Sequence, residues 1–278
     1  MKGVYSIMRI YHPVRGVGGA LREDSFAIID DAGVEIGKGG LEYRVVKKML
    51  PERPLDIEMN MNAHPVASDT LYGALCARAE SIKDEQGGLS ARLYTRCAID
   101  DTERHEYFTR MGFDDFDGDE LFVLMVPADM NGRRRNYSPL GTKSIDVDLR
   151  TRTRREEFLL GLKEFGYVEH ANEWLEERMK EPVFIARAVY HGSDFVGQML
   201  VTGTQNEAVL EMVCVEPKWR GRGVASALID EAVTQLSSQH VPHLLARAVR
   251  RNKSAMSLFK RSGFAWVRTE CYLLGRDL

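Results

Sequence analysis

The sequence lacks the features that mark several classes of protein. Its 278 residues include only 4 cysteines, none in a Cys-x-x-Cys pair, and each lies in an apolar segment. We therefore expect reduced, largely buried thiols in a reducing compartment rather than disulfides. No apolar run reaches the roughly 18 residues that a membrane-spanning helix needs. The first residues also lack the apolar core of a signal peptide, so we expect a cytoplasmic protein without a membrane partner.

A large charge excess and metal-ligand spacing are absent as well. The formal net charge of -3 is too small to attract nucleic acid, and the 7 histidines show no metal-ligand spacing. We therefore expect neither a nucleic-acid partner nor a metal. Residues 1–130 contain 15 Lys+Arg against 23 Asp+Glu, whereas residues 131–278 contain 23 against 18. The more basic second part is the better candidate for binding an anion.

What is present is an ordinary globular composition arranged in two parts. Hydrophobic residues make up 44% and charged residues 28%, which excludes disordered and fibrous chains. The length is typical of two domains. Because the polar segment 129–142 has neither helical nor strand periodicity, we predict a first domain at 1–130, a linker at 131–142 and a second domain at 143–278.

Hydrophobic periodicity predicts a similar series of strands and helices in both parts, and hence an α/β fold. In the first part we expect strands at 4–10, 26–29, 55–61, 91–98 and 121–126, with helices at 69–82 and 101–111. In the second part we expect strands at 145–149, 183–190, 195–202, 209–215, 243–249 and 270–274, with helices at 154–165, 171–179, 224–236 and 252–261.

Short segments repeat between the two parts. Ile-Glu-Met at 57–59 corresponds to Leu-Glu-Met at 210–212, and each triplet leads through an apolar segment to a proline. The pattern Phe-x-Arg-x-Gly-Phe occurs at 108–113 and again at 259–264. Repetition of segments in the same order favours an internal duplication over chance similarity.

The segment at 213–225, Val-Cys-Val-Glu-Pro-Lys-Trp-Arg-Gly-Arg-Gly-Val-Ala, predicts a strand, a glycine-containing loop and the start of a helix. The first amides of a helix have no partner within it, and the helix dipole attracts negative charge there. Gly221 and Gly223 would let the backbone approach a phosphate, and the loop arginines add positive charge. We expect a diphosphate ligand. The Gly-Lys-Ser/Thr of a Walker loop is absent, and Ser226 replaces the third glycine of a dinucleotide site.

This segment resembles the GNAT superfamily of acyl-CoA-dependent N-acetyltransferases, whose pattern Arg/Gln-x-x-Gly-x-Gly/Ala is met at 220–225. Asn252-x-x-Ala255 and the Gly-Phe pair at 263–264 are similar to the family's next helix and its end. The resemblance is most specific over 183–278. It implies an α/β (α+β) chain of two tandem GNAT-like domains. Each would be a mixed, mostly antiparallel sheet with flanking helices and one splayed pair of parallel strands.

The resemblance also implies acetyl-CoA as co-substrate. In the family, the loop amides hold the pyrophosphate, the backbone of the preceding strand pairs with pantetheine, and an asparagine lies beside the pantetheine arm. The implied binding residues here are Val213, Cys214, Val215, Arg220, Gly221, Arg222, Gly223, Val224, Ala225, Asn252 and Phe259.

Attack of an amine on a thioester needs a base, oxyanion donors and accurate positioning. We expect Glu211, on the strand that leads to the loop, to be the base, with Glu207 as second candidate and an ordinary strand glutamate as the alternative. The family commonly has a tyrosine as general acid where this chain has Phe259, which cannot donate a proton. Tyr272 on the last strand is the substitute that we consider.

The first part lacks the loop. Its corresponding segment at 65–71 has neither glycine nor arginine, so we expect a degenerate copy with an ordinary helix N-cap at Ser68 or Asp69. Asp101 also replaces Asn252. Residues 15–20 match the short family pattern, but no amphipathic helix follows, and we expect a loop there.

The expected function is therefore an enzyme, an acetyl-CoA-dependent N-acetyltransferase acting on a primary amine of a small molecule. Two alternatives stay open. One is a CoA-binding regulatory pseudoenzyme, for which Phe259 is the argument. The other is a phosphate- or RNA-binding module, for which the arginine runs at 133–135, 150–155 and 247–251 are the argument. A homodimer also stays open.

Overall fold

The computed structural model describes residues 8–130, 139–163 and 171–278. Its contacts divide the chain into two compact units, Met1–Asp117 with Cys271–Leu278, and Gly118–Glu270. Parts of the predicted strand at 4–10, the linker at 131–142, the helix at 154–165 and the arginine run at 133–135 lie outside the described residues.

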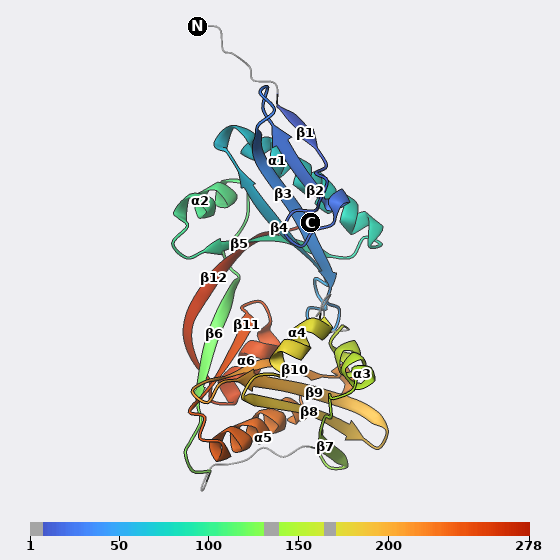
Figure 1. The fold of residues 1–278 in the computed structure, drawn as a ribbon, viewed down its shortest axis with the longest axis vertical. Helices are drawn as coiled ribbons and strands as arrows, with labels where there is room; N and C mark the ends of the chain where they lie inside the picture. The colour runs from blue at the N-terminus through green and yellow to red at the C-terminus, as the bar shows by residue number, and fades with distance from the viewer. Residues whose placement is uncertain (1–7, 131–138, 164–170) are drawn as a thin grey trace. The chain divides into compact units, whose positions relative to one another are not determined.

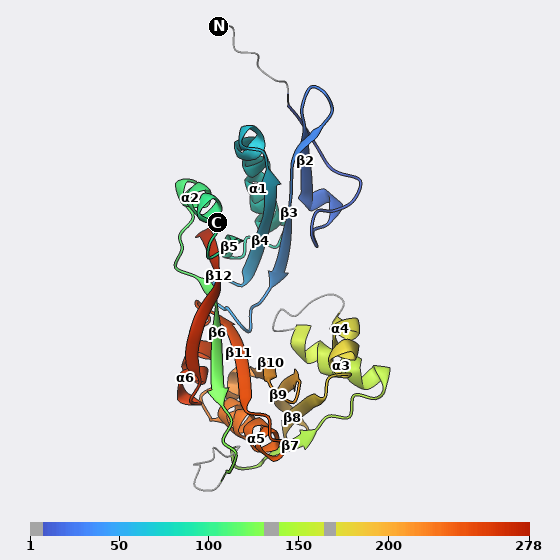
Figure 2. The same ribbon diagram turned by 60° about the vertical axis from the view of Figure 1, so that its left-hand side comes forward.

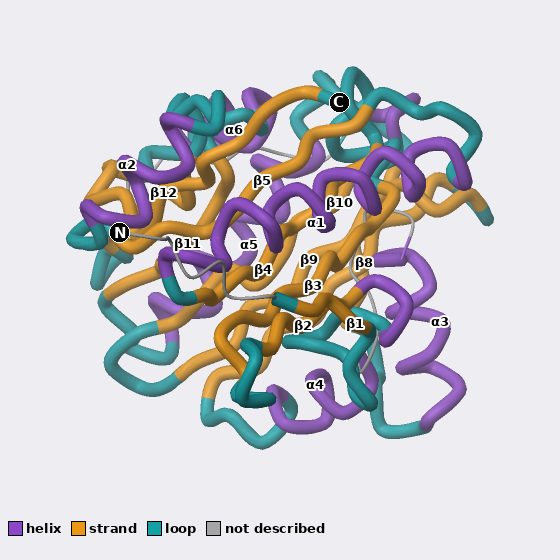
Figure 3. Tube along the Cα trace, turned by 90° about the horizontal axis from the view of Figure 1, so that it is seen from above, coloured by secondary structure: helices purple, strands orange, loops and turns teal. Residues whose placement is uncertain are grey.

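The first unit is a sheet covered by one long helix. Its elements are β1 (Arg9–Tyr11), β2 (Ser25–Ile29), β3 (Glu35–Val45), β4 (Leu55–Ala63), α1 (Pro65–Glu85), β5 (Ala91–Ala98) and α2 (Thr102–Arg110), with a 3-10 turn at Arg22–Asp24. The strands follow the order β1-β2-β3-β4-β5 and are antiparallel except for the pair β4–β5. Helix α1 packs on β2, β3 and β4 (Figures 1 and 3), because its buried residues recur at helical spacing.

Strand β3 is the element that the sequence pattern misses. Its glycines interrupt the alternation of apolar and polar residues. A Cβ atom on Gly39 would lie 2.8 Å from the Asn60 carbonyl oxygen and 2.8 Å from the Leu75 side chain of α1. The glycine is therefore required by the close approach of strand and helix, which the sequence does not display.

The second unit places helices on both faces of its sheet. Its elements are β6 (Gly118–Met125), β7 (Thr142–Asp146), α3 (Arg152–Lys163), α4 (Ala171–Arg178), β8 (Val183–His191), β9 (Asp194–Gly203), β10 (Ala208–Val215), a 3-10 turn at Pro217–Trp219, α5 (Val224–Ser238), β11 (His243–Val249), α6 (Lys253–Arg261) and the first part of β12 (Ala265–Asp277). Helix α5 shares a core with Met199 and Val201 of β9. The alternate residue Gln198 donates instead to the Phe158 carbonyl of α3 at 2.9 Å, so α3 lies on the other face (Figure 2).

Each unit takes its last strand from the other half of the sequence. Strand β6 follows α2 in the chain but pairs antiparallel with β11 of the second unit, from Asp119↔Val249 to Met125↔His243. The C-terminal part of β12 pairs with β5 of the first unit, from Cys271↔Ala98 to Asp277↔Arg92. The compact units therefore differ from a sequential division at 131–142.

The predicted fold class is confirmed. Among the described residues, twelve strands have the hydrogen-bonded order β1-β2-β3-β4-β5-β12-β6-β11-β10-β9-β8-β7. The sheet is mixed, with parallel pairs β4–β5 and β10–β11. Both parallel pairs occupy equivalent places in the duplicated order of elements, as the resemblance implied.

The cysteines and the apolar character of the helices were also considered in the sequence, and the structure describes both. None of the four cysteines forms a disulfide in the described chain; Cys97 and Cys214 are buried, and Cys76 and Cys271 are half-buried. Within the described ranges, no helix has both the length and the apolar character needed to cross a membrane.

The pairing of β12 with β5 leads to a prediction about stability. Leu274 lies on β12, yet its fully buried side chain belongs to the core of the first unit. We expect Leu274→Ala to destabilise that unit by about 2–5 kcal/mol, because it leaves a cavity. Hydrogen exchange should then accelerate in α1 and β5 but not in α5. The control Leu258→Ala, in the second unit, should do the reverse. Faster exchange in α5 alone after Leu274→Ala would contradict the assignment of β12.

Candidate functional site

The two parallel strands of the second unit part after three paired residues. Pairing between β10 and β11 covers Ala208–Leu210 opposite Leu244–Ala246 and then stops, although both strands continue. On its other side, β10 remains paired with β9 as far as Val215, with a β-bulge between Leu210 and Met212. A bulge bends and twists its strand, which accounts for the parting at this point.

The loop after β10 exposes the start of α5. Gly221 (φ 73°) and Gly223 (φ 86°) have left-handed backbone conformations that favour glycine. A Cβ atom on either would meet nothing within 4 Å, so the space beside them is open. Gly223 caps α5 without a side-chain hydrogen bond, and the first turn of the helix contains no acidic residue. The opening amides of α5 can therefore bind an anion.

The loop arginines have different roles. The Nε of Arg220 donates to the Val215 carbonyl at 3.1 Å, which fixes the loop to the end of β10. The exposed guanidinium of Arg222 lies 5.0 Å from the centre of the Trp219 ring, a cation–π contact. Arg220 shapes the loop, whereas Arg222 places positive charge at its surface.

The other predicted carrier-binding residues have clear structural positions. Val213 packs against the core beneath α5, together with the buried Val215 and Val224. Cys214 is 5% exposed and lies opposite Gln198 on β9. Ala225 is half-buried in the first turn of α5 and also contacts the core. A carrier would thus meet the backbone of these residues rather than their side chains.

Asn252 and Phe259 stabilise α6. The Oδ1 of Asn252 accepts from the Ala255 amide at 3.1 Å and caps the helix. Phe259 is buried and packs on the rings of Phe122 and Phe264, at 5.4 and 5.1 Å. Their predicted contact with the carrier stays a prediction, and Phe259 offers no proton to it.

Glu211 lies where the strands part. Its side chain is 15% exposed, and its Oε1 accepts from the Thr202 hydroxyl at 2.7 Å and lies 3.2 Å from the Nε of Arg178. Arg178 is on α4, so the carboxylate faces the α3–α4 side of the sheet. Glu207 is exposed in the turn before β10. Of the two predicted bases, Glu211 is the one beside the bulge.

Tyr272 belongs to the first unit, whereas Glu211 belongs to the second. The tyrosine belongs to the part of β12 that pairs with β5, opposite Cys97, and its ring lies 5.6 Å from that of His105 in the first unit. The physical reason is that β12 leaves the second unit after Glu270 and pairs with β5 of the first unit. No contact within the second unit supports Tyr272 as a proton donor.

An arginine fills the equivalent place in the first unit. Pairing of β4 with β5 stops after Glu58 and Tyr94, although both strands continue. Arg104 bridges the parted strands, donating to the carbonyls of Met61 and Arg96, both at 2.9 Å, and to the Thr95 hydroxyl at 2.5 Å. Burial lowers the pKa of Arg104.

Arg104 is a residue that the sequence interpretation missed. Three positions after the capping Asp101, it corresponds to Ala255, which follows Asn252 at the same spacing. The internal repeat of the sequence therefore contained the information needed to find Arg104. In the second unit this position is Ala255, whose side chain is too short to bridge β10 and β11.

The predicted N-cap of α1 was wrong. The helix begins at Pro65 and is capped by His64, whose Nδ1 accepts from the Val66 amide at 3.4 Å. Proline is favoured at the first helical position because that amide has no helical acceptor. Asp69, inside the helix, accepts instead from the Tyr107 hydroxyl at 3.2 Å. The first unit therefore has no glycine loop ahead of its helix.

The loop at residues 15–20 is confirmed as a loop that no α-helix follows directly. The Gly19 amide donates to the Glu42 carboxylate at 3.0 Å, and the Asn60 side chain donates to the same carboxylate oxygen at 3.2 Å. A carboxylate of the protein thus occupies the position where an anion would bind, and the short sequence pattern is misleading here.

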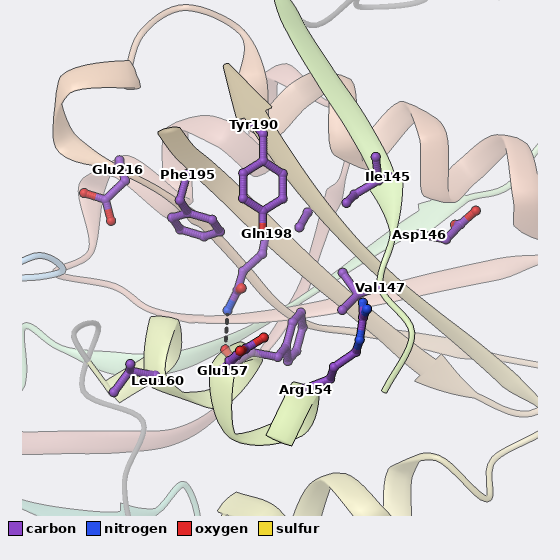
Figure 4. Close-up of a pocket in the computed structure, with 12 residues that line it drawn as sticks. Ile145, Asp146, Val147, Arg154, Glu157, Leu160, Tyr190, Phe195, Gln198 and Glu216 are labelled. Atoms are coloured by element: carbon purple, nitrogen blue, oxygen red, sulfur yellow. Dashed lines mark hydrogen bonds between the residues drawn. The ribbon is translucent and has the colours of Figure 1, made fainter. Parts of the chain in front are cut away.

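A separate pocket of about 400 Å³ lies between α3 and the sheet (Figure 4). Its lining combines aromatic, aliphatic and charged side chains: Ile145, Asp146, Val147, Arg154, Glu157, Phe158, Leu160, Ala188, Tyr190, Phe195, Gln198 and Glu216. Gln198 is four residues from Thr202 on the same face of β9, or about 13 Å at the rise of a strand. The pocket is therefore distinct from the surroundings of Glu211.

Comparisons with known proteins agree with this geometry. Residues 150–275 match the family model described as Acetyltransferase (GNAT) domain. The C-terminal part of the chain is therefore similar to GNAT acetyltransferases. A search of curated proteins gives no match.

Two solved structures with TM-scores above 0.5 have a similar fold over nearly the whole chain, and a third match is weaker. A GCN5-related N-acetyltransferase from Sphaerobacter thermophilus is 14% identical, with 94% of this chain and 82% of that chain covered and a TM-score of 0.51. A probable N-acyltransferase of unknown function from Enterococcus faecalis is 10% identical, with 91% and 61% covered and a TM-score of 0.56. A tandem GNAT protein from the clavulanic acid biosynthesis pathway is 13% identical, with 98% and 83% covered and a TM-score of 0.43.

The loop geometry predicts the effect of Gly223→Glu. A carboxylate at this position would point into the open space before α5 and repel a phosphate, so acetyl-CoA affinity should fall at least about 10-fold. Gly33→Glu is the matched control, because Gly33 has a similar φ of 81° and equally open space in the first unit. Calorimetric titration of both variants checks the prediction; equal affinities would remove the loop as the binding site.

The comparison of the two units predicts the effect of Ala255→Arg. A guanidinium at this position should bridge β10 and β11 as Arg104 bridges β4 and β5, and acetyl-CoA affinity should fall at least about 10-fold while circular dichroism is retained. Ser254→Arg adds the same charge at an exposed neighbouring position and should bind normally. Unchanged affinity of Ala255→Arg would show that the parted strands do not hold the carrier.

Proposed function

We propose that the second unit is an acetyl-CoA-dependent N-acetyltransferase that acts on a primary amine of a small molecule. The observation that carries the proposal combines two features of this unit. Pairing between β10 and β11 ends after Leu210, and the loop before α5 contains two glycines with left-handed backbone conformations. Together these supply a backbone edge for an extended chain and unpaired helix amides for a diphosphate. The match of residues 150–275 to the GNAT domain model supports the same assignment.

The residues present fit acetyl-CoA. The amides after Arg220 and the open space beside Gly221 and Gly223 suit the pyrophosphate. The backbone of Val213 and Val215 can pair with the amides of pantetheine where β11 has moved away. Bound there, acetyl-CoA supplies an acyl thioester that is activated for attack.

Glu211 is the proposed general base. It takes a proton from the ammonium group, and the free amine nitrogen then attacks the thioester carbonyl carbon. The new C–N bond forms as the C–S bond breaks, CoA leaves as the thiolate, and the attacking nitrogen loses its second proton to bulk water as the amide forms. The amide of Val213 or Cys214, which follows the bulge, is the proposed donor to the developing oxyanion.

The first unit is proposed to have lost carrier binding. Arg104 satisfies the carbonyls that pantetheine would meet, and α1 begins at Pro65 without an open loop. The remaining role of this unit is to stabilise the chain, to which it contributes a complete core around Leu71, Leu75 and Ile82.

The proposal is tested by thiol release from acetyl-CoA in the presence of a panel of primary amines. Turnover of at least one amine supports it. Tight CoA binding without turnover of any amine would support a regulatory CoA-binding protein instead, which the buried Phe259 favours. Salt-sensitive RNA binding that CoA does not inhibit would support the third alternative.

Glu211→Gln tests the base. Removing a general base typically lowers turnover about 100-fold or more, and the isosteric amide should leave CoA affinity unchanged. Glu58→Gln is the matched control, because Glu58 has the equivalent place in the first unit and accepts from the Tyr94 hydroxyl at 2.8 Å. Steady-state kinetics against pH measures both variants. Full activity of Glu211→Gln would exclude the residue as base.

A further inference from the structure

The carboxylate of Glu211 is paired with an arginine from α4, because the Nε of Arg178 lies 3.2 Å from its Oε1. A second arginine, Arg247, lies on β11 one residue beyond the last pair with β10. Arg247 donates a hydrogen bond to Glu270, which raises the pKa of Arg247, and the charges of Glu270, Glu211 and Glu207 add to this rise. Arg178 is therefore the guanidinium in contact with Glu211, and Arg247 is a second cation on the neighbouring strand that is itself paired with Glu270.

In both ion pairs the arginine is the more exposed partner. Arg178 and Arg247 have 39% and 50% of their side chains exposed, whereas Glu211 and Glu270 have 15% and 24%. Glu181, which pairs with Arg178, and the exposed Glu207 balance the positive charge of these arginines. Arg178 is therefore important for its direct contact with Glu211 rather than for an excess of positive charge.

Arg178 combines a strong charge with incomplete hydrogen bonding. Its Nε is buried and has no hydrogen bond of good geometry among the described residues, although it lies close to Glu211. Its NH1 is 3.6 Å from Glu181, and its guanidinium lies 5.9 Å from the centre of the Trp174 ring. The guanidinium of Arg178 is therefore held in place, but not all of its N–H groups have acceptors. It can donate hydrogen bonds to a further carboxylate.

The ion pair with Arg178 disfavours an acceptor that carries only positive charge. An alkylammonium ion would have to displace Arg178 from Glu211 without offering that guanidinium another partner. An acceptor with a carboxylate near its amine removes this difficulty. Its carboxylate pairs with Arg178, which releases Glu211 to receive the proton of the ammonium group.

We propose that the acceptor is an amino acid, or another amine with a carboxylate a few bonds away, and that Arg178 binds its carboxylate with Arg247 as the second cationic neighbour. This inference rests on the proposed acetyl transfer and names its substrate class. The transfer is balanced as above: one ammonium proton goes to Glu211, the C–N bond forms, the C–S bond breaks, CoA leaves as the thiolate, and the second proton of the nitrogen goes to bulk water.

Matched substrates test the inference. Each α-amino acid of a panel is assayed beside the amine that lacks its carboxylate, and the wild-type protein should favour the amino acid. Arg178→Gln should reduce that preference about 10- to 100-fold, mainly through KM, which is the effect expected from a lost charge-assisted hydrogen bond. Arg178→Lys should retain part of it. Arg152→Gln, an exposed arginine of α3, is the control and should keep the full preference.

A binding measurement separates failure of this inference from failure of the proposed function. Calorimetry with the CoA-loaded protein should show amino-acid binding that Arg178→Gln removes, even if no amine in the panel is acetylated. Acetylation of the amines lacking a carboxylate as efficiently as the amino acids would overturn the substrate class and leave acetyl transfer intact. Absence of both amino-acid binding and preference in the wild-type protein would equally overturn it.

Discussion

The interrupted hydrogen bonding between two adjacent parallel strands is the constraint on which the rest of this structure depends. Strands β10 and β11 begin as an ordinary pair and part at a bulge, so backbone groups in the middle of a sheet turn toward a ligand. Buried backbone groups need partners. In the second unit the proposed carrier would meet that requirement with its own amides and carbonyls.

The first unit meets the same requirement with its own atoms. Arg104 satisfies the two parted strands, His64 caps the helix, and Glu42 accepts from the loop that resembles a phosphate site. Each contact places a side chain of the protein where a ligand group could otherwise lie. The first unit keeps a complete core, and its own side chains satisfy polar groups that the second unit leaves open for the proposed carrier.

The electrostatics of the second unit follow a related logic. The start of α5 offers partial positive charge without an acidic residue in its first turn, and Arg178 of α4 is paired with Glu211. Both places offer hydrogen-bond donors that suit an anionic group. The proposed carrier and the proposed acceptor would therefore be recognised by the same kind of interaction.

The sequence by itself determined the elements and the loop. Most strands and helices follow from periodicity, and the loop at 220–225 is a contiguous segment whose glycines and neighbouring helix specify its chemistry locally. Only the tertiary structure decided which last strand completes which unit, that Tyr272 lies with the first unit, and that Arg104 and Arg178 contact the two parted strand pairs. These contacts join residues far apart in the chain. Spacing along the sequence does not specify such long-range contacts, because they depend on how the strands pair in three dimensions.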